Sequence, residues 1–226
     1  MTIGDGSGRD DQRGADVNAG GGAFVRVGVA GGIGAGKSAV ARAFARRGCV
    51  LSDSDAGAKA ALKLAEVKQT LRAWWGDGVF DSAGEVDRAS VARVIFADAS
   101  QRTRLEGLIH PILHRQRAEL IAQAKRNGAR GVVIDAPLLF EAGLEKECDA
   151  VVFVDTPREV RLRRVSATRG WNEEELSRRE AAQMPVDEKR RRCAFVIANG
   201  EGVSEVMLDD EAERVLKAIE SARARG

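Results

Sequence analysis

The chain has 226 residues, of which 44% are hydrophobic and 31% are charged, and its formal net charge is +2. This length allows one domain with a buried core and room for insertions, and the composition is ordinary for a globular enzyme. The near-neutral balance argues against a dedicated nucleic-acid-binding protein, and no apolar run approaches the about 20 residues that a membrane-spanning helix needs.

Three scattered cysteines, Cys49, Cys148 and Cys193, show no C-x-x-C spacing and are odd in number. They are typical of free thiols in a reducing compartment, so we expect no disulfide framework, no zinc site and a cytoplasmic location. Residues 1–23 are rich in Gly, Asp and Ser without periodic apolar positions, which predicts a disordered tail. We expect no secretory signal there, because the segment lacks an apolar stretch before a cleavage site.

Residues 31–38 read Gly-Gly-Ile-Gly-Ala-Gly-Lys-Ser and fit the phosphate-binding P-loop pattern G-x-x-x-x-G-K-[ST]. A buried strand at 24–30 and a helix at 38–47, ending at Gly48, are predicted on either side, which argues against a chance match in a Gly-rich turn. Backbone amides and the helix N-terminus would bind the phosphates, with Lys37 reaching the β- and γ-phosphates and Ser38 holding Mg²⁺. The candidate nucleotide-binding residues are Gly32, Ile33, Gly34, Ala35, Gly36, Lys37, Ser38 and Ala39.

Two carboxylates, Asp53 and Asp55, follow a second short strand predicted at 49–52. Ligands of open α/β sheets bind at the carboxyl ends of the strands, so this D-x-D should face the P-loop. A carboxylate there could accept the proton of an attacking hydroxyl or orient Mg²⁺. The alternative is that one of them only caps the helix that begins near Ala56. The position directly after a P-loop unit favours the functional interpretation.

Residues 56–127 have a mostly helical pattern, broken at 75–78 and at 82–84, and are too long for one crossover helix. We therefore expect an inserted helical subdomain with Trp74, Trp75, Phe80 and Phe96 in its core, although these aromatics could also line a pocket for an apolar substrate tail. His110-Pro111 should open another helix, because proline is tolerated at the first helical position. His110 alone is more typical of a capping or packed histidine than of a catalytic one.

Three further strands are predicted at 131–135, 150–155 and 195–198, each apolar and β-branched as central parallel strands are. The first ends in Asp135, which resembles a carboxylate that binds Mg²⁺ through water, and Pro137, Leu138 and Glu141 follow at the edge of the crevice. Asn199-Gly200 closes the last strand, and residues 206–224 should form the final helix. The chain is thus predicted to be an α/β protein with a five-stranded parallel sheet.

Positive charge is concentrated between the last two strands, where residues 158–192 hold eleven Lys or Arg against seven Asp or Glu. Two helices are predicted, the first carrying Arg161, Arg163, Arg164 and Arg169, and the second beginning at Asn172 and followed by Gln183. A basic helical hairpin beside a P-loop is typical of a closing lid that brings guanidinium groups onto a transferring phosphoryl group. The alternative is a solvated, charged helix pair, and we expect that of most of these arginines.

In combination, these motifs resemble the dephospho-coenzyme A kinase family over nearly all of the chain from Phe24 onward. The P-loop alone would fit thousands of proteins, whereas the run Asp135-x-Pro137-Leu138-Leu139-Phe140-Glu141 followed by arginine, Gln183 and Ile197-x-Asn199-x-Glu201 is far more particular. The resemblance implies a three-layer P-loop NTPase fold with a helical substrate-binding insertion and a helical lid. It also implies transfer of the ATP γ-phosphoryl group to the ribose 3′-hydroxyl of dephospho-CoA, the last step of coenzyme A synthesis.

The resemblance implies a role for each matching position. Asp55 would be the base or orienting carboxylate, Lys37 and Arg164 would neutralise the transferring phosphoryl group, and Asn199 would lie near the adenine of ATP. The acceptor would be held by the insertion and by Asp53, His110, Pro137, Leu138 and Glu141. The lid would contact the phosphates through Arg161, Arg169 and Gln183. Mg²⁺ would be held by Ser38 and Asp135. Ala30 departs from the family's pattern, because a hydroxyl residue such as Thr is expected there.

The resemblance divides the chain into a tail at 1–23 and a kinase domain at 24–226. Within that domain we expect a core at 24–56, 110–157 and 194–226, an acceptor-binding insertion at about 57–109 and a lid at about 158–193. We expect a monomer with ATP, Mg²⁺ and dephospho-CoA as its partners, and neither nucleic acid nor membrane.

Two other functions stay open. The chain could be another small P-loop kinase for a nucleoside monophosphate or a metabolite, because the P-loop and the lid would serve both. It could also be an ATP-binding regulatory or nucleic-acid-binding module that uses the basic hairpin as its contact surface. The carboxylates beside the P-loop argue against that module, and a GTPase is not expected because no N-K-x-D motif is present.

Overall fold

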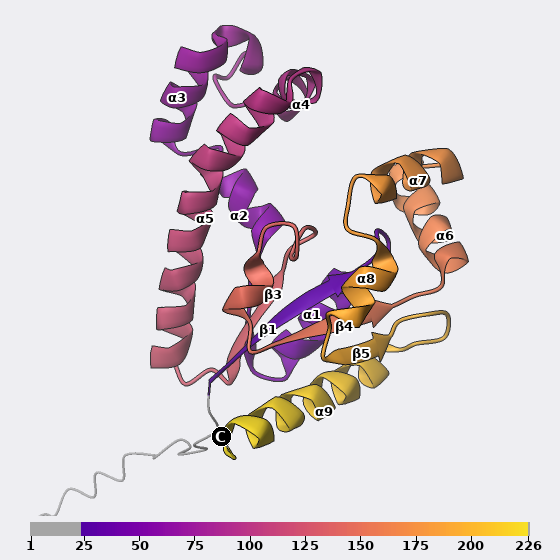
Figure 1. The fold of residues 1–226 in the computed structure, drawn as a ribbon. Coiled ribbons are helices and arrows are strands. Elements are labelled where there is room, and N and C mark those ends of the chain that lie inside the picture. The colour runs from indigo at the N-terminus through magenta and orange to yellow at the C-terminus, as the bar shows by residue number, and fades with distance from the viewer. Residues whose placement is uncertain (1–23, 226) are drawn as a thin grey trace, which may run out of the picture.

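The computed structural model describes residues 24–225, so the disorder predicted for residues 1–23 lies outside the described part of the chain. Its centre is a five-stranded, all-parallel sheet in the order β2-β3-β1-β4-β5 (Figure 1). The strands are β1 (Val25–Gly31), β2 (Cys49–Asp53), β3 (Gly131–Asp135), β4 (Ala150–Asp155) and β5 (Phe195–Ala198). All five had been predicted at these places, and the α/β class is confirmed.

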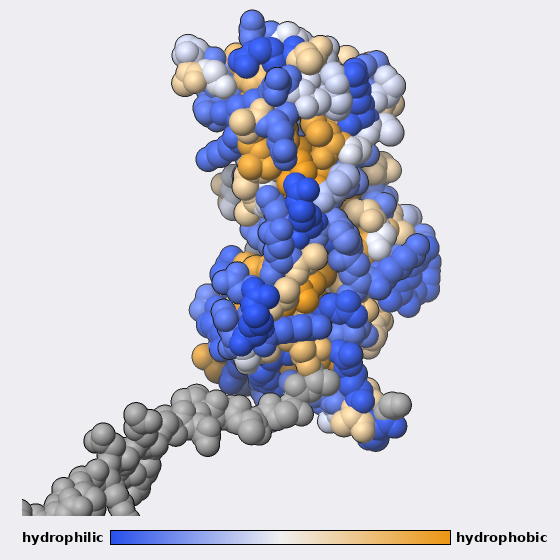
Figure 2. All heavy atoms as spheres, turned by 90° about the vertical axis from the view of Figure 1, so that its left-hand side faces the viewer, coloured by the Kyte–Doolittle hydropathy of each residue, from blue (hydrophilic) through white to orange (hydrophobic). Residues whose placement is uncertain are grey.

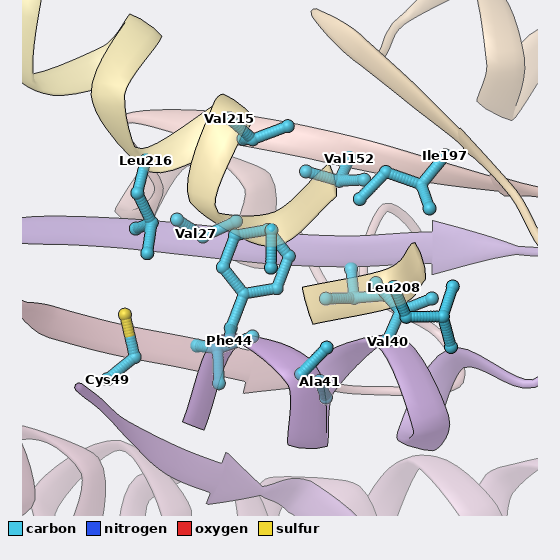
Figure 3. Close-up of a cluster of buried hydrophobic side chains, with 14 of the residues drawn as sticks. Val27, Val40, Ala41, Phe44, Cys49, Val152, Ile197, Leu208, Val215 and Leu216 are labelled. Carbon is cyan, nitrogen blue, oxygen red and sulfur yellow. The ribbon is translucent and has the colours of Figure 1, made fainter. Parts of the chain in front are cut away.

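Both faces of the sheet are covered, as continuous apolar strands require. Alternate residues of β1 point to opposite faces: Val27 and Val29 pack against α1 (Lys37–Arg46) and α9 (Glu205–Arg223), whereas Ala30 lies in the second core cluster, on the side of α5 (Ala99–Arg126). Figure 3 shows Phe44 of α1 directed toward β1 and α9, where it is fully buried. This three-layer arrangement holds the loop between β1 and α1 at the carboxyl edge of the sheet.

The insertion contains α2 (Ser54–Ala61), α3 (Ala65–Trp75), the 3₁₀ turn η1 (Asp77–Val79), α4 (Arg88–Ala97) and most of the first half of α5. Trp74, Trp75 and Phe80 pack on its small core, as expected. Of the two positions predicted for Phe96, the core was wrong, because this side chain lies in the last turn of α4 with 69% of its surface exposed. A helical pattern alone does not say whether a residue at the last turn faces a neighbour or a cleft.

The prediction that His110-Pro111 opens a helix was also wrong, because α5 runs without interruption through Pro111. Proline removes one hydrogen bond to the carbonyl four residues earlier, that of Gly107. Both positions are exposed, so water can bind that carbonyl. The expected boundary between insertion and core at residues 109 and 110 therefore falls inside one continuous helix.

The segment between β4 and β5 forms three helices where two had been predicted: α6 (Arg158–Arg169), α7 (Glu173–Ala181) and the short α8 (Val186–Arg191). Figure 1 shows α6 and α7 projecting on one side of the carboxyl edge and α3 and α4 on the other. A short 3₁₀ turn, η2 (Leu144–Glu147), follows β3. The side of the molecule seen in Figure 2 is mostly hydrophilic, with hydrophobic residues showing in patches between hydrophilic ones. Over residues 24–225, no helix is both long and apolar enough to cross a membrane.

Candidate active site

A cleft of about 1030 Å³ lies at the carboxyl edge of the sheet, between the insertion and the helices α6 and α7. It is bounded by the P-loop, by the ends of β2 and β3, by α4 and α5, and by α6 and α7. Fourteen residues that sequence reasoning had selected line it: Ile33, Gly34, Gly36, Lys37, Ser38, Ala39, Asp53, Asp55, Asp135, Pro137, Leu138, Arg164, Arg169 and Gln183. Segments far apart in the chain are thus brought to one cavity.

The carbonyl oxygen of Ala35, in the middle of the P-loop, accepts hydrogen bonds from three side chains. The donors are Oγ1 of Thr156 at 3.0 Å, Nδ2 of Asn199 at 2.8 Å and Nη1 of Arg164 at 3.2 Å. Thr156 and Asn199 are buried and follow β4 and β5 directly. Three segments distant in sequence therefore hold this carbonyl away from the cleft.

Other carbonyls of the loop are held in the same way. Arg161, which is 6% exposed, donates to the Ile33 carbonyl at 3.2 Å and to the Thr156 carbonyl at 3.2 Å, and it pairs with Glu180. Nζ of Lys37 donates to the carbonyls of Gly31 at 3.2 Å and Gly32 at 3.1 Å. Because the carbonyls of Ile33 and Ala35 are bonded to these side chains, the amides of the same two peptide units, those of Gly34 and Gly36, can point toward an anion in the cleft. The amide of Ala35 instead donates to the Gly32 carbonyl at 3.2 Å.

Glycines allow this loop geometry. Gly34 and Gly36 have φ of 77° and 83°, in the left-handed region that other residues rarely adopt. A Cβ on Gly36 would lie 2.3 Å from Nδ2 of Asn199, and one on Gly32 would lie 2.7 Å from Nη1 of Arg161. The close approach of the bracing side chains therefore explains the glycines at both positions.

The charges at the base of the cleft are perturbed by burial. Desolvation lowers the pKa of Lys37 to about 8, against the opposing attraction of Asp135, and the nearby cations Lys189 and Arg169 lower it further. Desolvation also raises the pKa of Asp135, although a hydrogen bond from Ser38 and the charge of Lys37 oppose that shift. A polyanion bound beside Lys37 would favour its charged form.

Ser38 and Asp135 form the candidate Mg²⁺ site. Ser38 is close enough to Asp135 to oppose the rise in the pKa of that carboxyl group, so a hydroxyl oxygen and a carboxylate lie near each other at the start of α1. Mg²⁺ usually takes one or two protein oxygens and completes its shell with water and nucleotide phosphates, which this pair can accommodate. Within residues 24–225 no cluster of three or more acidic, His or Cys side chains forms a metal site of the protein-only kind.

The two carboxylates after β2 have different surroundings. Asp53 lies beside Asp135 in the register of β2 and β3, and its Oδ1 accepts the amide of Ala56 at 2.9 Å, which caps α2. Asp55 is exposed, lies in the first turn of α2 and lines the cleft. The capping alternative thus describes Asp53, and Asp55 keeps its carboxylate directed at the cavity.

Several predicted site residues lie behind or beside the cleft instead. Four of them lie at the side of the P-loop that faces away from the cleft: Gly32, Ala35, Arg161 and Asn199. The side-chain amide of Asn199 therefore binds the Ala35 carbonyl and not the adenine that had been expected. His110 is exposed on α5 and is not among the residues lining the cleft. Glu141 accepts the Met184 amide at 2.9 Å and pairs with Lys189 at 2.9 Å. Burial works to raise the pKa of Glu141, but Lys189 and this amide hold it below the usual range.

The structure adds residues that sequence reasoning had missed. Ile95 and Leu105 of the insertion form an apolar part of the cleft together with Leu138 and with Phe96, for which a pocket position was the alternative prediction. Arg42, Lys59 and Arg102 add positive charge to the cleft. Trp171, between α6 and α7, lies within cation–π distance of Arg169 and Arg179. Arg42 could have been predicted from the sequence, because it lies one helical turn after Ser38 and therefore on the same face of α1. Thr156 could have been found by the rule that placed Asp135, because it directly follows a strand.

Comparisons with known proteins agree on one family. The model of the dephospho-CoA kinase family matches residues 25–205. A dephospho-CoA kinase from Deinococcus radiodurans is 40% identical over 195 residues, which make up 86% of this chain and 92% of that protein. One from Thermobifida fusca is 39% identical over 187 residues, 80% of this chain and 90% of that protein.

Solved structures show the same fold. The crystal structure of TT1252 from Thermus thermophilus has a TM-score of 0.72 and 34% identity, with 88% of this chain and 97% of that chain covered. The dephospho-CoA kinase from Campylobacter jejuni has a TM-score of 0.61 at 20% identity, again covering 88% of this chain and 97% of that one.

The close contact between Gly36 and Asn199 predicts that a methyl group added at position 36 weakens ATP binding. Gly36→Ala would place a Cβ against Asn199 and strain a left-handed residue, so ATP affinity should fall by about 10- to 100-fold, the equivalent of about 1–3 kcal/mol. Isothermal titration calorimetry measures the affinity, and circular dichroism checks that the variant is folded. Gly78→Ala is the matched control, because a Cβ there meets nothing within 4 Å. Unchanged affinity in Gly36→Ala would contradict the bracing.

The lowered pKa of Lys37 predicts proton uptake on nucleotide binding. Below about pH 8 the ammonium is already charged. Above that value it must regain a proton to pair with the triphosphate, so ATP affinity should fall as the pH rises. Calorimetry about one pH unit higher, in two buffers of different ionisation enthalpy, should report uptake of most of one proton. Lys37→Met should show none, and an absence of uptake in the unsubstituted protein would refute the shift.

Proposed function

We propose that this chain, which belongs to the dephospho-CoA kinase family, transfers the γ-phosphoryl group of ATP to the ribose 3′-hydroxyl of dephospho-CoA, giving coenzyme A and ADP. This is the last step of coenzyme A synthesis. The observation that carries the proposal is that a P-loop lysine, Lys37, and a free carboxylate, Asp55, line the same cleft. Phosphoryl transfer needs a cradle for the donor and a group that orients the acceptor hydroxyl.

The donor is ATP, held by its phosphates. The amides of Gly34 and of residues 36 to 38, at the N-terminus of α1, bind the oxygens of the triphosphate. Lys37 neutralises the transferring group together with Arg164, whose guanidinium lines the cleft while bonded to the Ala35 carbonyl. Such fixed positive groups stabilise charge that spreads over the phosphoryl oxygens in the transition state.

Ser38 and Asp135 would hold Mg²⁺ when the nucleotide binds, and the ion would offset the negative charge of the phosphate groups. Burial of the Asp135 carboxylate supports this role, because a buried negative charge is stabilised by a cation.

The acceptor lies between the P-loop and the insertion. Asp55 accepts or orients the hydroxyl proton, and the cations Arg42, Lys59 and Arg102 face the diphosphate of dephospho-CoA. The apolar surface formed by Ile95, Phe96, Leu105 and Leu138 suits the pantetheine portion. Asp53 holds α2 in place, and Pro137 shapes the opposite wall.

The lid consists of α6, α7 and α8 and closes over the phosphates. Arg169 and Gln183 line the cleft from this side, whereas Arg161 ties the lid to the back of the P-loop. Closure would exclude water, which otherwise competes with the acceptor for the phosphoryl group.

We further propose that the protein acts as a monomer in the cytoplasm. Its three cysteines are free thiols, and burial raises the pKa of each to about 12, which keeps them protonated and suits a reducing compartment.

The acceptor separates this function from that of another small P-loop kinase. Mg·ATP with dephospho-CoA, AMP, CMP or adenosine should release ADP fastest with dephospho-CoA, by a factor of about 100 or more in kcat/KM, if the insertion recognises the extended acceptor. Coupled ADP detection and mass spectrometry of the product measure the outcome. Equal or faster turnover of a nucleoside monophosphate would favour the alternative kinase instead.

Asp55→Asn tests the acceptor carboxylate. It should lower kcat by about 100-fold or more, because the amide cannot take the proton, and leave ATP affinity within about twofold. Steady-state kinetics and calorimetry give the two values. Asp187→Asn, an exposed change on α8, is the matched control and should behave as the unsubstituted enzyme. Collapse of ATP binding in Asp55→Asn would show that Asp55 serves the metal or the fold.

A further inference from the structure

Lys189 is one of the most buried charged side chains in residues 24–225, with 2% of its surface exposed. It lies on α8 and donates from Nζ to Oε1 of Glu141 at 2.9 Å and to Oε1 of Gln183 at 3.1 Å. A buried ammonium is costly unless it is paired and hydrogen-bonded, so these two contacts explain how this site tolerates the charge.

The same contacts join three segments at the base of the lid. Glu141 comes from the loop after β3, Gln183 from the turn between α7 and α8, and Lys189 from α8 itself. Oε1 of Glu141 also accepts the amide of Met184 at 2.9 Å, next to Gln183. The turn that carries Gln183 is therefore fastened to the sheet by both the side chain of Lys189 and a backbone bond.

The chemistry of Lys189 fixes which way the amide of Gln183 turns. An ammonium has three donors and no acceptor, so only the oxygen of a glutamine amide can face it. The NH₂ group at the other end of the planar amide is then directed away from Lys189. Gln183 lines the cleft that also contains Lys37 and Arg164. Its free end is a pair of donors, which suits an anionic oxygen.

We propose that Lys189 is a positioning residue: paired with Glu141, it orients Gln183 so that the amide NH₂ donates to a phosphate oxygen of the bound nucleotide. The identity of that anion rests on the proposed function. Glu141, which the family resemblance had placed at the acceptor, serves on this account as the counter-ion of Lys189.

Gln183→Glu separates a positioning role from a structural one. A carboxylate keeps an acceptor for Lys189 but has no NH₂ to offer the nucleotide. We expect the melting temperature to stay within a few degrees, KM for ATP to change little and kcat to fall by about 10- to 100-fold, as for loss of one transition-state donor. Unchanged kcat in this folded variant would overturn the proposal.

Lys189 is tested by removing its charge together with that of its partner. Lys189→Met alone would leave the Glu141 carboxylate unpaired and could unfold the protein, whereas Glu141→Gln with Lys189→Met leaves no buried charge. This double variant should also lose about 10- to 100-fold in kcat, because the amide of Gln183 is no longer held. Arg191→Met, exposed on the same helix, is the matched control for loss of one positive charge and should keep full activity.

A mutant cycle shows whether Lys189 acts through Gln183. Adding Gln183→Ala to the Glu141→Gln/Lys189→Met protein should cause no further loss beyond about twofold. Losses that multiply would overturn the proposal, since two independent roles would then be present.

An activity-independent readout keeps this test separate from the acceptor assignment. In ¹⁵N-labelled protein the side-chain NH₂ pair of Gln183, assigned from its absence in Gln183→Glu, should shift on titration with Mg²⁺ and a non-hydrolysable ATP analogue. In the Glu141→Gln/Lys189→Met variant that shift should be lost. If the chemical shift of this resonance does not change when the nucleotide analogue is added to the unsubstituted protein, the inference is overturned. A failure to phosphorylate dephospho-CoA would overturn only the proposed function.

Discussion

The site depends on the hydrogen bonds that turn the P-loop carbonyls away from the cleft. The carbonyl of Ala35 is bonded to Thr156, Asn199 and Arg164, and that of Ile33 is bonded to Arg161. A peptide unit whose oxygen is fixed on one side directs its amide to the other, so these contacts orient the donors that grip a phosphate. The glycines of the loop are needed because the bracing groups approach closer than a side chain would allow.

The order of the strands makes this bracing possible. Because β1 lies between β3 and β4, with β5 beyond β4, the residues that follow β4 and β5 reach the back of the loop. Asp135, at the end of β3, reaches its other flank together with Asp53 at the end of β2. Thr156, Asn199 and Arg161 are all buried polar groups, so loss of one would remove a hydrogen bond that holds the back of the loop. The loop is therefore held in shape by the ends of the strands and by α6 as well as by its own eight residues.

Much of the fold could be predicted from the sequence because its signals are local. Runs of β-branched residues predicted the strands. The P-loop pattern, together with the strand and helix that flank it, predicted the phosphate-binding part of the cleft, including Lys37 and Ser38. Other features depended on packing that no local pattern encodes. Pro111 lies within a helix since its lost hydrogen bond is exposed to water, and Phe96 ends a helix at the cleft instead of in a core. The partners of Arg161 and Glu141 are distant in sequence, so their bracing and pairing roles emerged only in three dimensions.

The most direct test of the account is a crystal structure with Mg²⁺ and a non-hydrolysable ATP analogue. We predict that the phosphates lie on the amides of Gly34 and of residues 36 to 38, that the Ala35 carbonyl keeps its bonds to Thr156 and Asn199, and that Asp55 faces the γ-phosphate. A triphosphate bound away from these amides, or an Ala35 carbonyl rotated into the cleft, would contradict the claim that bracing from behind shapes the phosphate site.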